Sequence, residues 1–519
     1  MNNRFASFFL LIVISINILW GIGSVPLLDP DEPVYAETAR EMIEFNDYLS
    51  PRIYNEYWYD KPPMYYWLVA GVFKTSGVSD FGARLPSAIM GIATVLMLYL
   101  FLQRLSSESM AFWSTMVLGT CVEFFYLGKA AVTDMTLLFF ITGALLSFYD
   151  RKYWLMYVFM GFATLTKGPI GVVFPGAIII LYLLIMRQFG EIKRMHILRG
   201  LLICVAIAGP WYYLMYSVHG QVFIDTFLGF NNITRFTTPE HPTRVVWYYY
   251  VPVLLLGLFP WTGLFLSSLK ASYTESSGTD FELMIFTNIW WVFVFIFFTI
   301  SKTKLVSYIF PLFPPLAMII GWNISRLINE RFRKTEWFIA GASIITFIFI
   351  GCGWVYGGSF FPELTTVGRV LGGITVLLAI AIAMALLKYR DFKLAVLCHV
   401  FAGIVTMFVV FSFMLPTIAN RLSVKDAATY YTKYCDLTAN VYVDKFLRPG
   451  FMYYTRIPGE ELKPGIEDTF DFPHIAGNSY IIVRGLEYRR WDLATTNNVE
   501  EIYNTGDIYI LKQIKDTPQ

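Results

Sequence analysis

Two short stretches decide the fold: Asp29-Pro30-Asp31-Glu32-Pro33-Val34-Tyr35-Ala36-Glu37 and Trp58-Tyr59-Asp60-Lys61-Pro62-Pro63. They belong to a polar loop directly behind an N-terminal hydrophobic helix. Most of the first 420 residues are apolar, so the charge in this loop is expected at a membrane surface. Ionisable groups are costly to hold there, and such a cluster indicates a functional site.

The composition defines the class of protein. Of 519 residues, 56% are hydrophobic and only 15% are charged, whereas a soluble domain usually carries roughly 25% charged residues. Mean hydropathy is +0.54. These values predict an α-helical polytopic membrane protein. The net charge of +2 is too small to indicate nucleic-acid binding, and the five cysteines form no disulfide framework.

Apolar runs near the length needed to cross a bilayer predict about thirteen transmembrane helices. The first is expected to be an uncleaved helix rather than a signal peptide, because it lacks a persuasive cleavage site and further spans follow. The predicted spans are 5–25, 82–104, 110–127, 131–149, 153–166, 168–186, 197–217, 247–268, 283–300, 306–325, 337–356, 367–387 and 394–415.

Basic residues in the short connections predict the orientation, since they accumulate on the cytoplasmic side. With a cytoplasmic N-terminus, the inner connections hold compact basic clusters. The outer face then holds the long segments 26–81 and 218–246, as well as the C-terminus. The inner clusters are Arg104, Arg151–Lys152, Arg187/Lys193/Arg194/Arg199, Lys270, Arg326/Arg331/Arg333/Lys334 and Lys388/Arg390/Lys393.

The composition changes near residue 416. We expect a membrane domain over 1–415 and a small α/β domain over 416–519 on the outer face. Within the latter, 421–434 is typical of a helix, whereas 440–444, 479–484 and 507–512 are rich in β-branched residues or alternate like strands.

The loop 26–81 contains the first candidate site residues. Residues 32–45 predict an amphipathic helix, which Asp31 could cap. A second interpretation is that crowded carboxylates, Asp31 and Glu32 among them, serve catalysis or bind a cation. Lys61 is an outer-face lysine fixed by two prolines, and it would suit a lipid-linked phosphate.

Further charges lie at predicted outer ends of spans. Asp134 falls at the edge of the hydrocarbon, where it is expected either to form an ion pair with a neighbouring basic residue or to serve the reaction. Lys167 and Lys304, with Tyr308, add cations and a hydroxyl to the same face. An anionic headgroup fits such a set better than a transport path does.

The segment 218–246 holds His241 and Arg244. His241 could bind zinc together with Asp60, since imidazole and carboxylate suit that metal. A histidine in a polar loop is more often an ordinary hydrogen-bonding residue, and both interpretations stay open.

These residues, in this order, resemble the polyprenyl-phosphate-sugar glycosyltransferases of the C superfold (GT-C). That family includes protein O-mannosyltransferases and bacterial 4-amino-4-deoxy-L-arabinose lipid A transferases. The resemblance covers the membrane part, and the family's thirteen helices and small outer domain agree with the pattern above. It rests on Asp31-Glu32-x-x-Tyr35-Ala36-Glu37-x-x-Arg40-Glu41-Met42, Asp60-Lys61-Pro62-Pro63, Arg84-Leu85-Pro86-Ser87, Thr133-Asp134 and Lys304-Leu305-x-x-Tyr308.

The resemblance implies a role for each candidate. Asp31, with Glu32 and Asp134, would be catalytic. Asp60 and His241 would occupy a metal position, although the family usually has Glu-Lys-Pro where this chain has Asp60-Lys61-Pro62. The carrier phosphate would be held by Lys61, Tyr308, Lys304 and Arg244.

The implied function is inverting transfer of one sugar from undecaprenyl phosphate at the outer face of a bacterial inner membrane. The nearest resemblance is aminoarabinose transfer to lipid A. The alternatives are hexose transfer to protein Ser/Thr or to a surface glycan, and, in a different class, a flippase of lipid-linked sugars. Transporters commonly show repeated halves, and no repeat is evident here.

Overall fold

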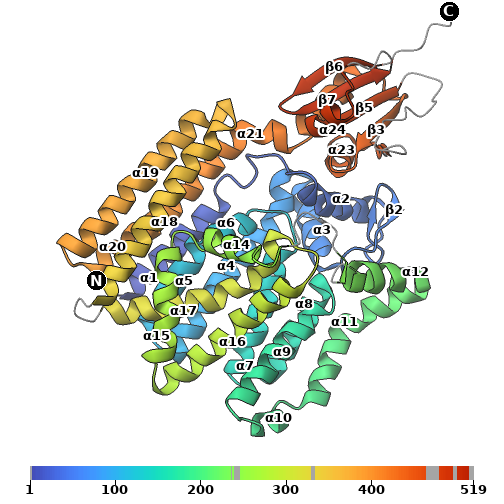
Figure 1. Ribbon diagram of the computed structural model, residues 1–519. Helices are drawn as coiled ribbons and strands as arrows, with labels where there is room; N and C mark the ends of the chain where they lie inside the picture. Colours follow the sequence, from blue (N-terminus) through green and yellow to red (C-terminus); the bar gives the residue numbers. More distant parts are fainter. Residues whose placement is uncertain are drawn as a thin grey trace, which may run out of the picture. The chain divides into compact units, whose positions relative to one another are not determined.

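The computed structural model describes residues 3–234, 237–238, 246–328, 334–462, 479–494 and 499–513. Within these ranges the chain forms two compact units (Figure 1). Unit 1 comprises residues 1–20, 59–65 and 86–410, and unit 2 comprises 21–58, 66–85 and 411–519. This division differs from the linear boundary expected at 415/416, because segments 21–58 and 66–85 pack with the C-terminal residues.

Unit 1 is helical. Two helices are divided between the units: α3 (Met64–Ser76) starts in unit 1 and ends in unit 2, whereas α4 (Asp80–Leu105) starts in unit 2 and ends in unit 1. The remaining helices are α1 (Asn3–Leu19), α5 (Glu108–Thr120), α6 (Val122–Gly128), α7 (Asp134–Tyr149), α8 (Tyr153–Lys167), α9 (Ile170–Ile185), α10 (Gly190–Arg194), α11 (Ile197–His219), α12 (Gln221–Ile224), η1 (Asp225–Thr234), α14 (Tyr250–Gly257), α15 (Thr262–Thr274), α16 (Gly278–Ile300), η3 (Val306–Leu312), α17 (Phe313–Ile328), α18 (Lys334–Ser359), η4 (Pro362–Leu364), α19 (Thr365–Ala383), η5 (Met384–Lys388) and α20 (Phe392–Val409).

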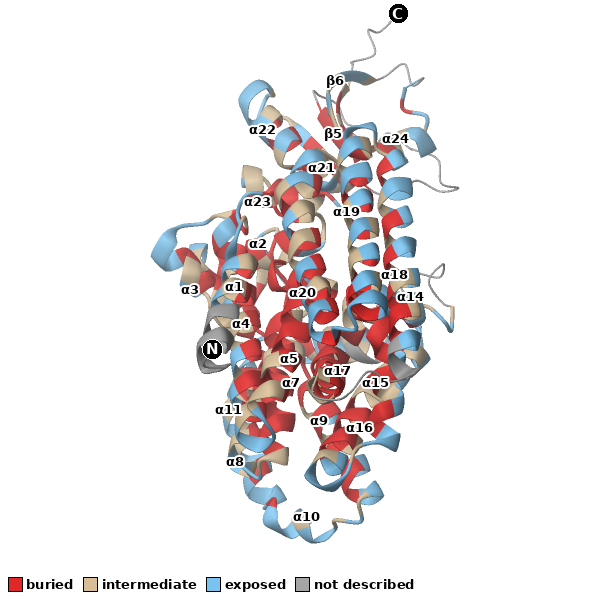
Figure 2. Ribbon diagram, turned by 90° about the vertical axis from the view of Figure 1, so that its left-hand side faces the viewer, coloured by how far each residue is buried: buried red, intermediate tan, exposed pale blue. Residues whose placement is uncertain are grey.

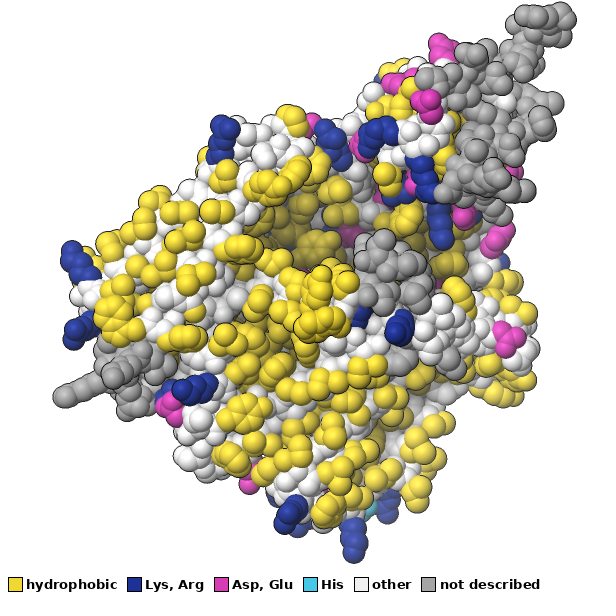
Figure 3. Space-filling view, viewed as in Figure 1, with side chains coloured by type: hydrophobic (Ala, Val, Ile, Leu, Met, Phe, Trp, Pro, Cys, Tyr) yellow, Lys and Arg dark blue, Asp and Glu magenta, His cyan; other side chains and the backbone are white. Residues whose placement is uncertain are grey.

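Each of the thirteen predicted spans overlaps at least one helix, although the first extends six residues beyond the end of α1. In the described residues, seven helices are long and apolar enough to cross a membrane, and two bent pairs, α5–α6 and α14–α15, raise the number to nine. The bends are 68° and 103°. The helices α7 and α9 are apolar but shorter. Hydrophobic side chains cover much of the face over α16 and α17, and Lys and Arg lie toward its margins (Figure 3).

The centre of unit 1 is the crossing of α5 and α17, which are largely buried (Figure 2). The two helices approach closely because Gly321 has no side chain: a Cβ there would lie 2.4 Å from the backbone nitrogen of Ser114. By contrast, α11 and α18 keep most of their apolar surface exposed, as helices in contact with lipid do.

Unit 2 is built around a five-stranded sheet in the order β4-β3-β5-β7-β6. The strand β3 (Asn440–Asp444) is parallel to β4 (Glu460–Leu462) and β5 (Ser479–Arg484), whereas β7 (Ile508–Gln513) is antiparallel to β5 and to β6 (Val499–Thr505). Three of these strands match the predicted ones. The other elements are α2 (Asp31–Glu44), β1 (Arg52–Ile53), β2 (Glu56–Tyr57), η6 (Val410–Met414), α21 (Leu415–Leu422), α22 (Lys425–Tyr434), α23 (Arg448–Thr455) and α24 (Gly485–Arg490).

The predicted amphipathic helix at 32–45 is confirmed as α2, which packs against α23. Its N-cap residue is Pro30, so the interpretation of Asp31 as the cap is wrong. Asp31 is instead the first helical residue, where a carboxylate complements the positive end of the helix dipole. The side chain of Asp29 accepts hydrogen bonds from the backbone N–H of Val424 (2.8 Å) and of Gly450 (3.1 Å).

Candidate functional site

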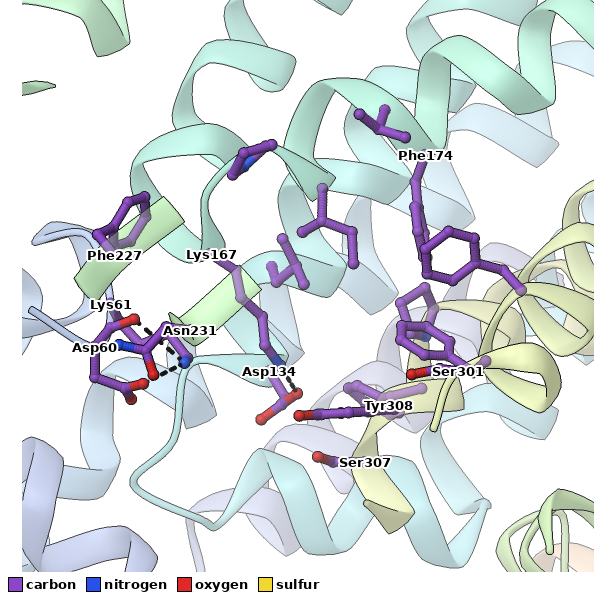
Figure 4. A pocket seen from close by; sticks show the side chains of 18 of the residues that line it. Asp60, Lys61, Asp134, Lys167, Phe174, Phe227, Asn231, Ser301, Ser307 and Tyr308 are labelled. Carbon is purple, nitrogen blue, oxygen red and sulfur yellow. Dashed lines mark hydrogen bonds and ion pairs between the residues drawn. The ribbon is translucent and has the colours of Figure 1, made fainter. Parts of the chain in front are cut away.

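A cavity of about 510 Å³ in unit 1 collects several of the predicted site residues. Its polar wall includes Asp60, Lys61, Asp134 and Tyr308, together with Lys167. Figure 4 shows these side chains converging from separate segments of the chain. The rest of the wall is mostly apolar, and its residues include Leu137, Ile170, Val173, Phe174, Phe227, Leu228, Phe297, Phe298 and Phe310. One enclosure therefore offers charge at one part and hydrocarbon-like surface at another.

The ion pair between Lys167 and Asp134 is the first part of the polar wall, with Nζ 2.7 Å from Oδ1. Asp134 is the first residue of α7 and Lys167 is the last of α8, so the two meet because these helices form an antiparallel hairpin. Each charge also suits its helix end. The ring of Tyr308, on η3, lies beside the pair, with its centroid 5.3 Å from the ammonium (Figure 4).

The pair Asp60–Lys61 is the second part, with Nζ 3.0 Å from Oδ1. These residues precede Pro62 and Pro63, which restrict the backbone before α3 begins at Met64. The amide nitrogen of Asn231 donates to the carbonyl of Tyr59 at 3.1 Å and so ties η1 to this segment.

The four charged side chains of the cavity wall are partly buried but not sealed. Their exposed fractions are 11% for Asp134, 16% for Lys167, 13% for Asp60 and 14% for Lys61. Among the described residues of the wall, two cations and two anions give no net charge. Each ammonium is held by a carboxylate that an anionic ligand entering the cavity could replace.

Lys304 lies outside the residues that line the cavity. Its ammonium donates to the carbonyls of Phe298 (3.2 Å) and Thr299 (2.7 Å), in the last turn of α16. Burial, with a contribution from Lys302, lowers the pKa of Lys304. This geometry indicates that Lys304 caps a helix end, and it gives the predicted phosphate contact no support.

Asp31 and Glu32 belong to unit 2. Asp31 is exposed. Glu32 is 4% exposed and pairs with Arg84, with Nε–Oε1 at 2.8 Å and Nη2–Oε2 at 2.5 Å. Its Oε2 also accepts from the backbone N–H of Leu28. Both oxygens of Glu32 are therefore engaged, and its geometry fits a structural role better than the predicted catalytic one.

A second buried cluster follows on α2. Arg40 pairs with Glu37 at 2.5 Å and donates to the carbonyl of Tyr453 at 3.2 Å. Glu41 accepts from the backbone N–H of Asn55. Burial raises the pKa of Glu37 to about 8, although Arg40 opposes the shift, and burial also raises the pKa of Glu41.

The predicted metal position rests on Asp60 and His241. His241 and Arg244 both lie outside the described residues. In the part of the chain that the structure describes, no three His, Cys, Asp or Glu side chains form a group that could hold a metal ion. Because Asp60 is paired with Lys61, the described donors alone do not fit zinc, and the metal site stays a prediction.

Lys167 is the residue whose importance the sequence left open. The segment Thr166-Lys167-Gly168-Pro169 separates two apolar runs and predicts a lysine on the outer face. No sequence pattern identifies Asp134 as the partner of this lysine. Lys129, five residues before Asp134, is nearer in sequence. The structure instead directs the ammonium of Lys129 to the carbonyl of Trp20 and over the ring of Phe125.

Known proteins share this pattern. A family model described as dolichyl-phosphate-mannose-protein mannosyltransferase matches residues 60–214. An uncharacterized protein of Aquifex aeolicus is 31% identical over 330 residues, which are 64% of this chain and 74% of that protein. An undecaprenyl phosphate-alpha-4-amino-4-deoxy-L-arabinose arabinosyl transferase of Aeromonas hydrophila is 29% identical over 330 residues, which cover 60% of this chain and only 59% of the relative.

The fold has a solved counterpart. The crystal structure of ArnT from Cupriavidus metallidurans bound to undecaprenyl phosphate superposes with a TM-score of 0.78 and 19% identity, over 99% of both chains. This chain, with its helices, apolar spans and C-terminal sheet, therefore has the same architecture as that structure. It is a multi-span membrane protein. It belongs to the C-superfold glycosyltransferase family that includes protein mannosyltransferases and aminoarabinose transferases.

Proposed function

We propose that this chain transfers a single sugar from a polyprenyl phosphate to an acceptor at the outer face of the membrane. The observation that carries the proposal is the cavity of unit 1, where Lys61 and Lys167 share one enclosure with an extended apolar wall. A phosphate joined to a long hydrocarbon chain has the same two-part chemistry. The names of related proteins, which include undecaprenyl phosphate, support this donor class.

Donor binding exchanges ion pairs rather than adding a charge to an empty site. Each lysine already has a carboxylate partner, at 2.7 Å for Lys167 and 3.0 Å for Lys61. A phosphate that takes a share of either ammonium weakens that pair. Asp134 and Asp60 then become free to orient hydroxyl groups of the sugar.

The reaction breaks the bond between the anomeric carbon and the phosphate oxygen. The acceptor oxygen attacks from the opposite side, so the configuration at this carbon inverts. The polyprenyl phosphate leaves with the electron pair, and Lys61 and Lys167 stabilise the negative charge that grows on it. The hydroxyl of Tyr308, beside Lys167, can donate a hydrogen bond to a phosphate oxygen.

The role of Asp31 depends on the acceptor. A serine or sugar hydroxyl is barely acidic, so a carboxylate that takes its proton accelerates attack. A lipid A phosphate is already ionised near neutral pH, since the second pKa of a phosphate monoester is about 6. With that acceptor, Asp31 would orient the sugar or stabilise positive charge at its anomeric carbon.

The nearest acceptor by similarity is lipid A, with aminoarabinose as the sugar, because the Aeromonas hydrophila relative carries that name. The match to the mannosyltransferase family model favours a second candidate, hexose transfer to protein. Arg244 would add a phosphate contact in either case. Zinc at Asp60 and His241 would act as a Lewis acid, and no step above requires it.

The expected orientation has the N-terminus in the cytoplasm and residues 416–519 in the periplasm of an inner membrane. The basic clusters of the short connections support it. Cysteine labelling with an impermeant reagent, in a variant whose five native cysteines are replaced by serine, tests this orientation: Ser276→Cys should react only from the cytoplasm, and Thr438→Cys only from outside.

The deciding experiment mixes the purified chain with undecaprenyl phosphate carrying a radiolabelled sugar and with one acceptor at a time: lipid A, a Ser/Thr peptide or a glycan. Transfer to one acceptor, with release of undecaprenyl phosphate, supports the proposal and identifies the acceptor. Movement of labelled donor across liposomes without transfer would instead establish a flippase. Lys61→Ala should weaken donor binding more than Lys270→Ala, which alters an exposed lysine elsewhere.

A further inference from the structure

A second hollow of about 420 Å³ lies between α4, α7 and α8. Its wall is apolar over most of its length and includes Leu96, Leu100, Phe139 and Phe159. We call it the α4–α8 groove. Leu96 and Leu100 on its rim are 45% and 54% exposed, so the groove opens on the outer surface of the membrane-spanning helices.

The groove has the length of one membrane leaflet. On α4 it runs from Ala93 to Arg104, and along α7 it runs from Phe139 to Asp150, the C-cap residue of that helix. Eleven residues of helix rise about 16 Å, close to half of a hydrocarbon core about 30 Å thick.

All charged residues of the groove gather at one end. Arg104 and Lys152 both pair with the same oxygen of Asp150, Lys152 at 2.9 Å. The side chains of Arg104 and Lys152 are 54% and 47% exposed. Two cations against one carboxylate leave a net positive charge. An Arg offers five donors and a Lys three, so both keep donors for a further anion.

We infer that the α4–α8 groove binds an anionic phospholipid, with an acyl chain along Leu96, Leu100 and Phe159 and the phosphate on Arg104 and Lys152. A groove one leaflet long with a charged mouth matches a phospholipid whose headgroup lies at the interface and one of whose two acyl chains lies in the groove. Asp150 holds the two cations together at the mouth, and its negative charge opposes the binding of a further anion. This site is separate from the proposed catalytic cavity and depends only on the membrane location of the chain.

Native mass spectrometry of the full chain, titrated with phosphatidylglycerol or phosphatidylcholine, tests the inference. We expect one retained phosphatidylglycerol per protein and weaker retention of phosphatidylcholine. R104Q/K152Q should weaken phosphatidylglycerol binding about 10- to 30-fold. The matched control R199Q/K270Q removes one exposed Arg and one exposed Lys elsewhere and should bind like the wild type.

Two further variants separate lipid recognition from folding. Asp150→Asn should strengthen phosphatidylglycerol binding, because it raises the net positive charge, whereas a purely structural role would only lower the melting temperature. Ala93→Phe should fill the apolar end and reduce retention of both lipids. Equal binding of the two lipids, equal losses in R199Q/K270Q, or displacement by undecaprenyl phosphate would each overturn the inference.

Discussion

The ion pairs of unit 1 and those of unit 2 differ in how completely they are enclosed. In the cavity of unit 1, the paired side chains keep 11–16% of their surface exposed. In unit 2, Glu32–Arg84 and Glu37–Arg40 are at most 6% exposed and also bond to backbone groups. An enclosed pair that also bonds to backbone groups is part of the packed fold, whereas a partly open pair on a cavity wall can exchange its partner for a ligand.

The largest expected effect tests a residue outside both sets of pairs. Asp31→Asn should lower the turnover number about 10²- to 10⁴-fold, because a carboxylate that moves a proton or stabilises charge is lost. The melting temperature in detergent should not change, since Asp31 is exposed. Glu44→Gln, on the same helix and also exposed, is the matched control and should leave turnover unchanged. Near-normal turnover by the Asp31 variant would remove this residue from the mechanism.

An enclosed pair should reveal itself through stability. Arg84→Met leaves the Glu32 carboxylate buried without its partner and should cost about 3–5 kcal/mol of unfolding free energy. Thermal unfolding in detergent measures the loss. Adding Glu32→Gln should recover a large part of it, because the uncompensated charge is removed. A double variant no more stable than the single one would show that the pair acts through something other than charge.

An open pair should respond in the opposite way. Lys167→Ala and Lys61→Ala should each lower kcat/KM about 10²- to 10³-fold, because they remove a cation from the leaving phosphate. Thermal unfolding should shift little in either variant. Lys270→Ala provides the exposed-lysine control for both measurements. A loss of stability as large as that of Arg84→Met would place the cavity pairs with the structural ones.

The last expected effect is a pH dependence that arises in unit 2. In the folded state the pKa of Glu37 is raised from 4.5 to about 8, and burial also raises the pKa of Asp29. The folded state thus holds protons that the unfolded chain has released. This contribution is fully present below about pH 4.5 and is lost as the pH rises to about 8, with a slope of about 1.4 kcal/mol per pH unit for one proton.

Melting temperatures measured in detergent from pH 5 to pH 9 test this dependence. They should fall with rising pH for the wild type and fall less steeply for Glu37→Gln. A stability that instead rises with pH over this range would contradict the assignment.

Local patterns predicted much of the fold. The amphipathic period gave α2, and β-branched runs gave β3, β5 and β7. The strands β4 and β6 were not predicted, because they lie at the edges of the sheet and carry charge, as in Glu460-Glu461 and Glu500-Glu501. The bends at α5–α6 and α14–α15 were not predicted either, since an apolar run indicates the length of a span but not a change in its direction.

The site was predictable as a set of residues and not as a set of contacts. Motif residues identified Lys61, Asp134 and Tyr308 as candidates. The partner of Asp134 required the antiparallel α7–α8 hairpin, which brings together residues 33 positions apart. Unit 2 depends on contacts between residues that are far apart in the sequence, with separations of 395 and 421 positions. No periodicity in the sequence encodes such pairs.

The hydrogen bonds from Val424 and Gly450 to Asp29 also constrain how the protein is made. The two parts of unit 2 are separated by about 325 residues, which a ribosome adds in roughly 15 to 65 s at 5–20 residues per second. During that interval the segment that carries Asp29 and Asp31 lacks the backbone N–H donors of Val424 and Gly450. Nascent chains that stop short of residue 450 therefore lack the means to complete this unit.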